Sequence, residues 1–475
     1  MPIKRADGVT KSERYLKLLC DHTFLSLWSY PGVYRDQFSG KGTEGKEVCD
    51  LLVVFENHII IFSDKDCQFP NSDKLELDWN RWFKKAIQKS ADQVWGAERW
   101  ITQHPNRLFL DRACTLPFPI DIPDLSIMRF HLIVVAHDNA KRCQQQLGGS
   151  GSLIINSSVK GTAHYAGENG GVPFFVGDID PSQAFVHILD DTSLDIILGT
   201  LDTISDFVSY LTKKEKILRS DTVVFASGEE NLLAYYLMNM NEEDEHDFVM
   251  PTDVDGQINH LIFDEGLWEE FSQSSERQAQ VLADRVSYIW DNLIEAFSKH
   301  VIEDTQYFTT CPGIQETEPL LRFLARESRF RRRNLAAALY GLLESAPNDR
   351  RATRLICSAS PHEPYYIFLT YPQFEWIATY EKYREGRRYL LEACCSSVKL
   401  KFPDAQHIIG IATEPGLNSR RSEDAIYFDA TNWSEEKDAR AREDSEELNI
   451  PSNPNIFNVH DQEYPLQSPQ RNWIF

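Results

Sequence analysis

Residues 47–65 read EVCDLLVVFENHIIIFSDK, and this stretch decides the fold. Residues 48–55 and 58–63 are two runs rich in Val, Ile, Leu and Phe, separated by two polar residues. Such runs with a two-residue connection predict a hairpin of two buried strands. Asp50 lies inside the first run and Lys65 follows the second. The hairpin would therefore bring these two side chains together at one edge of a sheet.

Elements that cover a sheet are predicted on both sides of the hairpin. Residues 12–30 have apolar side chains at helical spacing, with Ser12 as the expected N-cap. Residues 78–103 form a long amphipathic pattern, and residues 130–136 (FHLIVVA) predict a third strand. The expected order is helix, strand, strand, helix, strand, which is an α-β-β-α-β core of the α/β class.

The rest of the chain divides by pattern and composition. We expect an N-terminal domain with an extension over residues 1–228, in which the turn-rich segment 144–175 marks an insertion or boundary. Residues 229–346 predict a helical middle, and residues 347–433 a smaller C-terminal α/β domain. Residues 434–475 are acidic and then proline-bearing, which favours an extended tail.

Bulk composition limits the classes of protein. Hydrophobic residues make up 42% and charged residues 25% of the chain, as in an ordinary globular protein. No apolar run approaches the roughly 20 residues of a membrane span, so no membrane association is expected. The nine cysteines are scattered without a CxxC pair, which predicts a reduced, cytoplasmic protein. The net charge of −23 argues against a surface coated for non-specific nucleic-acid binding.

The chemistry suggested by the hairpin is hydrolysis of a phosphodiester bond. That reaction needs carboxylates to hold Mg²⁺ and a group that orients or activates the attacking water. An aspartate inside a buried strand is costly unless it is paired or ligates a cation. Asp50 and Lys65 fit this requirement, and a plain ion pair between them is the alternative.

The hairpin with a helix on either side resembles the PD-(D/E)XK nuclease superfamily, which is restriction-endonuclease-like, and is nearest to its Mrr-type branch. The resemblance covers roughly residues 12–137. It implies that Asp50 is the metal-binding aspartate and that Lys65 positions the hydrolytic water. It also implies that Glu13, on the preceding helix, is a further catalytic and metal-binding acid. The implied cofactor is Mg²⁺ or Mn²⁺, the implied substrate is nucleic acid (DNA rather than RNA), and the implied setting is bacterial restriction or phage defence.

The sequence departs from the family pattern at the second acid. The pattern places Asp or Glu two residues before the lysine, and this chain has Ser63 there. Strand alternation puts Ser63 and Lys65 on one face and Asp64 on the other, so Asp64 would serve as a metal ligand only if a bulge re-aimed it. Glu13, Glu44 or Glu47 would otherwise supply the missing charge. The alternative function is a catalytically inactive, nuclease-like scaffold or regulator that acts through protein partners.

Basic and polar residues outside the hairpin suggest partners. Lys85, Lys89 and Gln93, on the helix after the hairpin, are candidates for contacts with backbone phosphates. The arginine run at 322–333, which ends in Arg331, Arg332 and Arg333, is the densest positive segment of an acidic chain. It predicts a grip on nucleic acid or on an acidic protein partner, and pairing with the protein's own carboxylates is the alternative.

Overall fold

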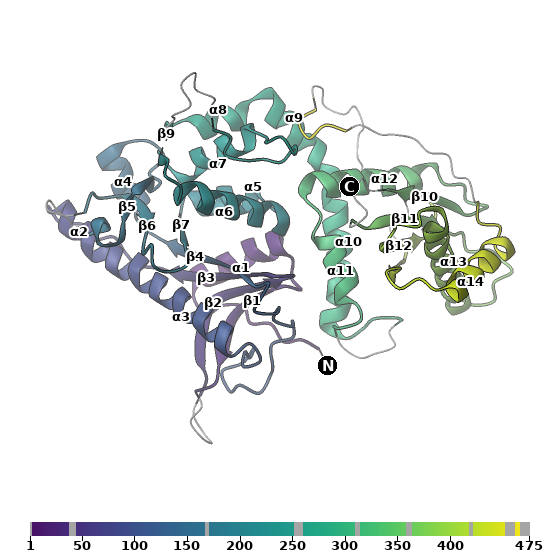
Figure 1. Cartoon of the computed structure of the whole chain (residues 1–475). Helices are drawn as coiled ribbons and strands as arrows, with labels where there is room; N and C mark the ends of the chain where they lie inside the picture. Colours follow the sequence, from purple (N-terminus) through teal and green to yellow (C-terminus); the bar gives the residue numbers. More distant parts are fainter. Residues whose placement is uncertain are drawn as a thin grey trace. The chain divides into compact units, whose positions relative to one another are not determined.

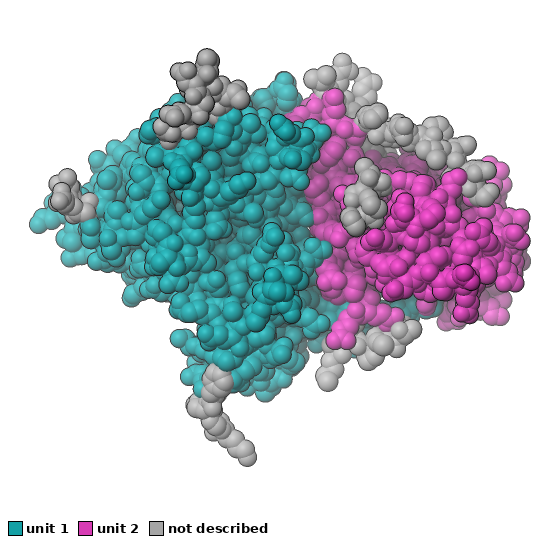
Figure 2. Space-filling model, viewed as in Figure 1, with its two compact units in different colours: residues 1–278, 295–308, 312–314 teal, residues 279–294, 309–311, 315–475 magenta. Residues whose placement is uncertain are grey.

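The chain is a mixed α/β protein, and its described part contains three sheets that each combine parallel and antiparallel strands. The computed structural model describes residues 2–37, 44–166, 171–250, 260–308, 314–357, 363–417, 421–451 and 461–465. The chain divides into two compact units, which Figure 2 colours separately. Unit 1 comprises residues 1–278, 295–308 and 312–314, and unit 2 comprises residues 279–294, 309–311 and 315–475.

Unit 1 is built on a five-stranded sheet with the order β1-β2-β3-β4-β7. The strands are β1 (Ser29–Arg35), β2 (Lys46–Phe55), β3 (His58–Lys65), β4 (Arg129–Ala136) and β7 (Val186–Asp190). The strands β1, β2 and β3 are antiparallel, whereas β3, β4 and β7 run parallel. The predicted hairpin and third strand are thereby confirmed. The carboxyl ends of the three parallel strands lie at one edge of the sheet (Figure 1).

Helices cover the two faces of this sheet. Those nearest the hairpin are α1 (Lys11–Phe24) and the continuous helix made of α2 (Leu75–Trp82), the π-helical segment η1 (Phe83–Gln88) and α3 (Lys89–Gln103). The ring of Phe62 on β3 lies 6.1 Å from that of Phe24 on α1. The hydroxyl of the next residue, Ser63, lies 3.4 Å from the side-chain oxygen of Gln93 on α3. Because neighbouring strand residues point to opposite faces, α1 and α3 cover opposite faces.

The first helix differs from the expectation at both ends. Thr10, not Ser12, is the N-cap, and its hydroxyl accepts a hydrogen bond from the Glu13 amide while Glu13 bonds back to the Thr10 amide. The helix ends at Phe24, and Leu25 takes a φ of 65°. The residues that follow form the edge strand β1, which the sequence did not predict. Apolar residues at positions 25–28 continue the helical spacing, and this concealed the turn.

A second, four-stranded sheet completes unit 1. Its order is β6-β5-β8-β9, with β5 (Ile154–Lys160), β6 (Phe175–Asp178), β8 (Val223–Ala226) and β9 (His260–Phe263). The turn-rich segment 144–175 therefore contains β5 and the first residue of β6. The accompanying helices are α4 (Ala140–Leu147), η2 (Gly161–His164), α5 (Ser193–Thr200), α6 (Ile204–Leu218), α7 (Glu229–Met238) and α8 (Leu267–Gln273).

Unit 2 holds the third sheet, with the order β10-β11-β12-β13. Its strands are β10 (Ala352–Ile356), β11 (Tyr365–Thr370), β12 (His407–Thr413) and β13 (Glu423–Asp429), and its helices are α11 (Glu318–Ala325), α12 (Arg329–Ser345), α13 (Tyr380–Lys401) and α14 (Glu435–Glu447). Helix α13 joins the parallel pair β11 and β12 and packs against the sheet through a buried core that includes Leu391 and Cys395. The helices α9 (Ser275–Asp284) and α10 (Tyr288–Glu303), joined by η3 (Arg285–Ser287), supply residues to both units, so the helical middle predicted at 229–346 is divided between them.

The predicted extended tail contains a helix. In α14 the Ser434 hydroxyl accepts a hydrogen bond from the Lys437 amide and caps the N-terminus. An ion pair four residues apart, between Arg442 and Asp438 at 2.7 Å, adds support on its surface. Acidic composition suggested a tail, but Glu, Lys, Arg and Ala are also strong helix formers. The proline-bearing residues 452–460 and 466–475 lie outside the described part of the chain.

Candidate active site

The hairpin opens into a fork at the end that carries Asp50. Paired residues of β2 and β3 run from Phe55–His58 to Leu51–Phe62 and stop there. Beyond this point β2 pairs with β1, through Cys49 and Val33 for example. The end of β3 continues to pair with β4, as far as Lys65. The fork leaves backbone groups of both strands open to side chains, and Asp50 is the first residue of β2 inside it.

Asp50 fills the fork with its carboxylate. The Asp64 amide of β3 donates a hydrogen bond to Asp50 Oδ2 at 2.6 Å, where a strand carbonyl would otherwise accept. Burial raises the pKa of Asp50 to about 6. The carboxylates of Asp64 and Glu13 act in the same direction, whereas the hydrogen bonds from the Asp64 amide and the Ser63 hydroxyl lower it. A partly buried carboxylate that is destabilised by burial and by other acids is suited to a cation.

Ser63 and Lys65 lie on the face of β3 that α3 covers. Ser63 is fully buried, and its hydroxyl lies between the Asp50 carboxylate and Gln93 Oε1. Lys65 is exposed at the end of the strand. Within the residues that the structure describes, Lys65 makes no ion pair with a carboxylate, so the plain ion pair with Asp50 does not form. Its amine remains available to another group.

Glu13 and Glu47 lie close enough to Asp50 for the carboxylates to repel one another. Partial burial raises the pKa of Glu47 to about 7, and the charges of Asp50 and Glu13 add to the rise, while Arg112 opposes it. The Glu13 carboxylate accepts a hydrogen bond from the Val9 amide at 2.6 Å as part of the α1 cap. Glu13 therefore has a structural task that the sequence did not predict. Glu44 forms an ion pair with Arg112 instead, at 2.8 Å.

Asp64 points away from Asp50, as strand alternation predicted. No bulge re-aims it, because β3 keeps its register with β4 through Asp64. Asp64 Oδ1 lies 2.5 Å from His137 Nε2, and His137 Nδ1 lies 2.5 Å from Asp191 Oδ1. Burial alone would lower the pKa of His137, but the hydrogen bonds and charges of the two aspartates raise it to about 10. His137 is thus an imidazolium between two carboxylates.

His137 is a residue of this region to which the sequence analysis gave no role. The available signal was its place directly after β4, together with Asp64 near the end of β3 and Asp191 directly after β7. Parallel neighbouring strands bring their carboxyl ends together, and this edge is where open α/β sheets bind ligands. The signal was missed because the parallel pairing of β7 with β4 was not predicted.

The donor set at the fork consists of oxygen atoms and contains few charges. Among the described residues, no group of three His, Cys, Asp or Glu side chains converges at metal-binding distance. The Ser63 hydroxyl bonds the Asp50 carboxylate, and Gln93 Oε1 lies 3.4 Å beyond that hydroxyl, so both are neutral oxygens. Mg²⁺ keeps several waters and accepts one or two carboxylates, so a site with one carboxylate and neutral oxygens fits a weakly held Mg²⁺.

The predicted phosphate contacts differ in their surroundings. Lys85 on η1 and Lys89 on α3 are both exposed and make no ion pair within the described residues, and Gln93 is half-buried beside Ser63. They lie along one helix that passes the fork at Gln93, and the π-helical segment η1 sits in its middle. Such segments recur at functional sites in helices.

The arginine run lies in unit 2 and is bound to the protein's own acids. Arg332 is fully buried, 2.7 Å from Asp291, which also pairs with Arg329 at 2.7 Å. Arg333 is buried against Asp284 at 3.1 Å, and Arg331 lies 3.8 Å from the Glu327 carboxylate. This is the pairing that the sequence left as the alternative. Arg332 and Arg333 have no exposed cation to offer a nucleic acid, so they take no part in the function proposed below.

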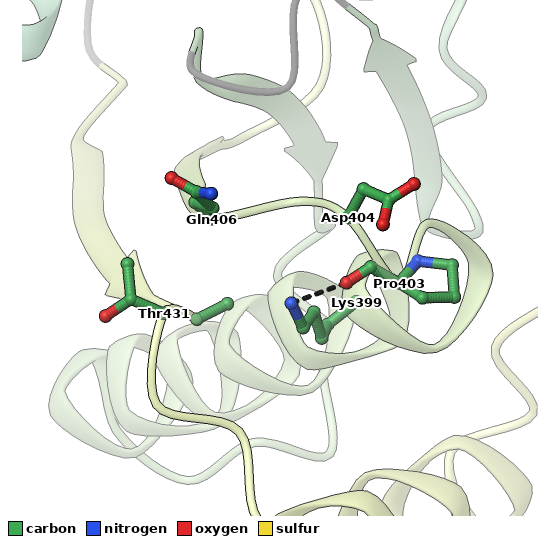
Figure 3. Close-up of a pocket in the computed structure, with 6 residues that line it drawn as sticks. Lys399, Pro403, Asp404, Gln406 and Thr431 are labelled. Carbon is green, nitrogen blue, oxygen red and sulfur yellow. Dashed lines mark hydrogen bonds between the residues drawn. The ribbon is translucent and has the colours of Figure 1, made fainter.

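Unit 2 also carries an open hollow beside the end of α13 (Figure 3). The Lys399 ammonium donates to the carbonyl oxygens of Pro403 and Ala405, both at 2.7 Å, so it closes the helix end. The ammonium of Lys399 is therefore engaged, whereas the lining residue Asp404 is exposed. The lining residues of the hollow are Lys399, Pro403, Asp404, Gln406, Ala430 and Thr431.

In the described part of the chain, no helix is both long and apolar enough to cross a membrane. Comparison of the whole chain with protein-family models, with curated proteins and with solved structures finds no match.

Proposed function

We propose that unit 1 is a Mg²⁺-dependent nuclease whose reaction centre is the fork between β2 and β3. The observation that carries the proposal is the Asp50 carboxylate inside the fork, 2.6 Å from the Asp64 amide, with Lys65, which has no ion pair among the described residues, at the end of the neighbouring strand. The order helix, antiparallel hairpin, helix and parallel strand also supports the resemblance to PD-(D/E)XK nucleases. In this chain the strand β1 joins the core before the hairpin.

The residues at the fork divide the chemistry between them. Asp50 would hold the cation together with the neutral oxygens of Ser63 and Gln93. When bound, Mg²⁺ would polarise the scissile phosphodiester and favour ionisation of a water. Lys65 would orient that water and offset the negative charge that develops on the phosphate. The exposed amines of Lys85 and Lys89 would hold the sugar-phosphate backbone in register.

DNA is the substrate that we favour, following the resemblance. The acidic chain also bears on the kind of binding. A net charge of −23 repels nucleic acid over most of the surface, so productive contact depends on Lys65, Lys85 and Lys89, which make no ion pair within the described residues. Binding should therefore be weak and steeply salt-dependent rather than tight and general.

The experiment is cleavage of supercoiled plasmid, single-stranded DNA and RNA with Mg²⁺ or Mn²⁺. Asp50→Ala and Lys65→Ala should each lower the rate by at least about 100-fold, since each removes a group that acts in the transition state. Asp73→Ala and Lys74→Ala, exposed and just before α2, are matched controls and should cleave like the wild type. Cleavage that survives both fork substitutions would refute the assignment.

A catalytically silent scaffold is the second candidate, and one observation favours it. Ser63 stands where a second carboxylate is expected, and no third acidic ligand converges on Asp50 among the described residues. A scaffold would cleave no nucleic acid with either metal but would form a stable complex with a protein partner. The variant Ser63→Glu separates the two candidates. It should lower the Mg²⁺ concentration that an active enzyme needs for cleavage, and it should leave a scaffold without activity.

A further inference from the structure

One histidine ties together the ends of the three parallel strands beside the fork. His137 follows β4, and its ring nitrogens lie 2.5 Å from Asp64 on β3 and 2.5 Å from Asp191 after β7. The Asp64 side chain is 1% exposed and that of His137 is 16% exposed, so solvent competes little for the bond between them, whereas Asp191 is 42% exposed. We name these three residues the strand-end bridge.

The turn that carries His137 is itself held in an unusual conformation. Asp138 has a φ of 68°, which is uncommon for a residue with a side chain. Its amide donates to Asp191 Oδ2 at 2.7 Å, and its carboxylate accepts from the Phe69 amide at 2.9 Å. Backbone strain of this kind persists only where the surroundings enforce it, and it gathers at functional sites. Asp191 thus bonds this turn at two points, the His137 ring and the Asp138 amide.

The bridge reaches the reaction centre through the backbone of Asp64. The same residue that bonds His137 through its carboxylate donates its amide to Asp50 Oδ2 at 2.6 Å. The pairing of β2 with β3 ends at Leu51 and Phe62, and Asp50 is the first residue of β2 beyond it. After Phe62, β2 therefore no longer pairs with the end of β3. On its other side β3 pairs with β4 through Lys65, and the bond between Asp64 and His137 adds a side-chain contact to the same strand end.

We propose that His137 is a positioning residue: by bridging Asp64 and Asp191 it fixes the end of β3, so that the Asp64 amide holds the Asp50 carboxylate in place. The consequence for metal binding rests on the proposed nuclease function, whereas the effect on the end of β3 does not. Groups behind a metal ligand typically set the affinity for the metal by about 10- to 100-fold.

The test uses the full chain with His137→Gln and the milder Asp191→Asn, which keeps the size of the side chain. Hydrogen–deuterium exchange of the segment 60–67 should rise in both variants, with little change in segments on β1 or β8. The half-saturating Mg²⁺ concentration for cleavage should rise by about tenfold, and the rate at saturating Mg²⁺ should change less. His22→Gln, an exposed histidine on α1, is the matched control and should change neither measurement.

The outcomes separate this inference from the proposed function. Unchanged exchange at 60–67 in both variants would overturn the positioning role, whatever the protein cleaves. A rise spread evenly over unit 1 would also overturn it, because His137 would then be a general stabilising residue. If the wild type cleaves nothing, the nuclease proposal fails, and the exchange measurement still decides whether the bridge fixes the end of β3.

Discussion

Asp50 combines two properties that ordinarily conflict. It sits in a buried strand, where a carboxylate is costly, and it accepts a single short backbone hydrogen bond in partial compensation. No lysine or arginine forms an ion pair with it within the described residues. At neutral pH such a carboxylate destabilises the folded state, as expected of a residue that serves chemistry rather than folding.

Replacing Asp50 should make the metal-free protein more stable at neutral pH. The pKa of Asp50 is raised to about 6, so the folded state binds more protons than the unfolded state between about pH 4 and pH 6. Its contribution therefore favours folding at low pH and is lost as the pH rises through 6. Asp50→Asn should raise the free energy of unfolding at pH 7.5 by about 1 to 3 kcal/mol and leave it nearly unchanged at pH 4.

Urea denaturation in EDTA at the two pH values measures this effect. The variant Asp73→Asn, at an exposed carboxylate, supplies the control and should match the wild type at both. An Asp50→Asn protein that is less stable than the wild type at pH 7.5 would show that the carboxylate is a stabilising group. Burial at the fork would then not destabilise the charged form of Asp50.

At the level of single residues, alternation along β3 was predictable and the partners were not. The sequence alone places Ser63 and Lys65 on one face and Asp64 on the other, and the structure confirms it. The bond between Asp64 and His137 joins residues 73 positions apart. Such a contact depends on how the parallel strands are ordered, which no local pattern in either segment specifies.

The helix that spans α2, η1 and α3 carries the exposed lysines proposed to contact phosphates. Lys85 and Lys89 lie on its exposed side, whereas Trp79 and Trp82 are buried on the opposite side. The periodic pattern predicted this helix within three residues at its start and to the residue at its end. Long amphipathic segments are the elements that sequence predicts best, because the same spacing recurs over many turns.

Lys85 and Lys89 should each contribute one phosphate contact to DNA binding. Each contact releases about one counterion, so Lys85→Ala and Lys89→Ala should each reduce the slope of log affinity against log salt by about 0.9. Binding is measured by fluorescence anisotropy in Ca²⁺, which limits cleavage. Lys216→Ala, exposed on α6, should leave the slope unchanged. If Lys85→Ala and Lys89→Ala keep the wild-type slope, as Lys216→Ala should, then Lys85 and Lys89 do not contact phosphates.

The strand β1 could not be predicted from the sequence. Its residues Ser29 and Tyr30 are fully buried, yet Pro31 and Gly32 follow them and both are poor strand formers. An edge position tolerates proline, because one side of the strand needs no amide donor. Only pairing with β2, through contacts such as Pro31 with Leu51, makes this segment a strand. That pairing is tertiary and leaves no periodic signal.

The division of the whole chain follows interior contacts rather than composition. Each unit draws residues from α9 and α10, in the middle of the chain, so the boundaries could not be read from linkers or charge runs. In unit 1, Glu295 accepts hydrogen bonds from the Ser26 amide and hydroxyl, both at 2.6 Å, across 269 residues. In unit 2, Asp291 meets Arg329 and Arg332. The predicted fold class was right at the coarse level of a mixed α/β protein.

Asp291→Ala should strongly destabilise unit 2. The change leaves the fully buried Arg332 and the nearly buried Arg329 without their carboxylate, and breaking a buried ion pair in this way costs about 3 to 5 kcal/mol. Chemical denaturation followed by tryptophan fluorescence measures the loss. Arg442→Ala removes an exposed ion pair on α14 and should cost less than about 1 kcal/mol. Similar losses for the two variants would mean that the Asp291 network is not a structural element of unit 2.

The central claim is that the Asp50 carboxylate inside the fork binds a divalent cation. Crystals of the wild-type protein soaked in Mn²⁺ and measured at the manganese absorption edge test it most directly, because anomalous scattering locates the ion without reference to activity. We predict an anomalous peak about 2.2 Å from Asp50, which is absent in Asp50→Ala crystals. An occupied manganese site elsewhere with none at Asp50, or a peak at the fork that persists in Asp50→Ala, would contradict the account.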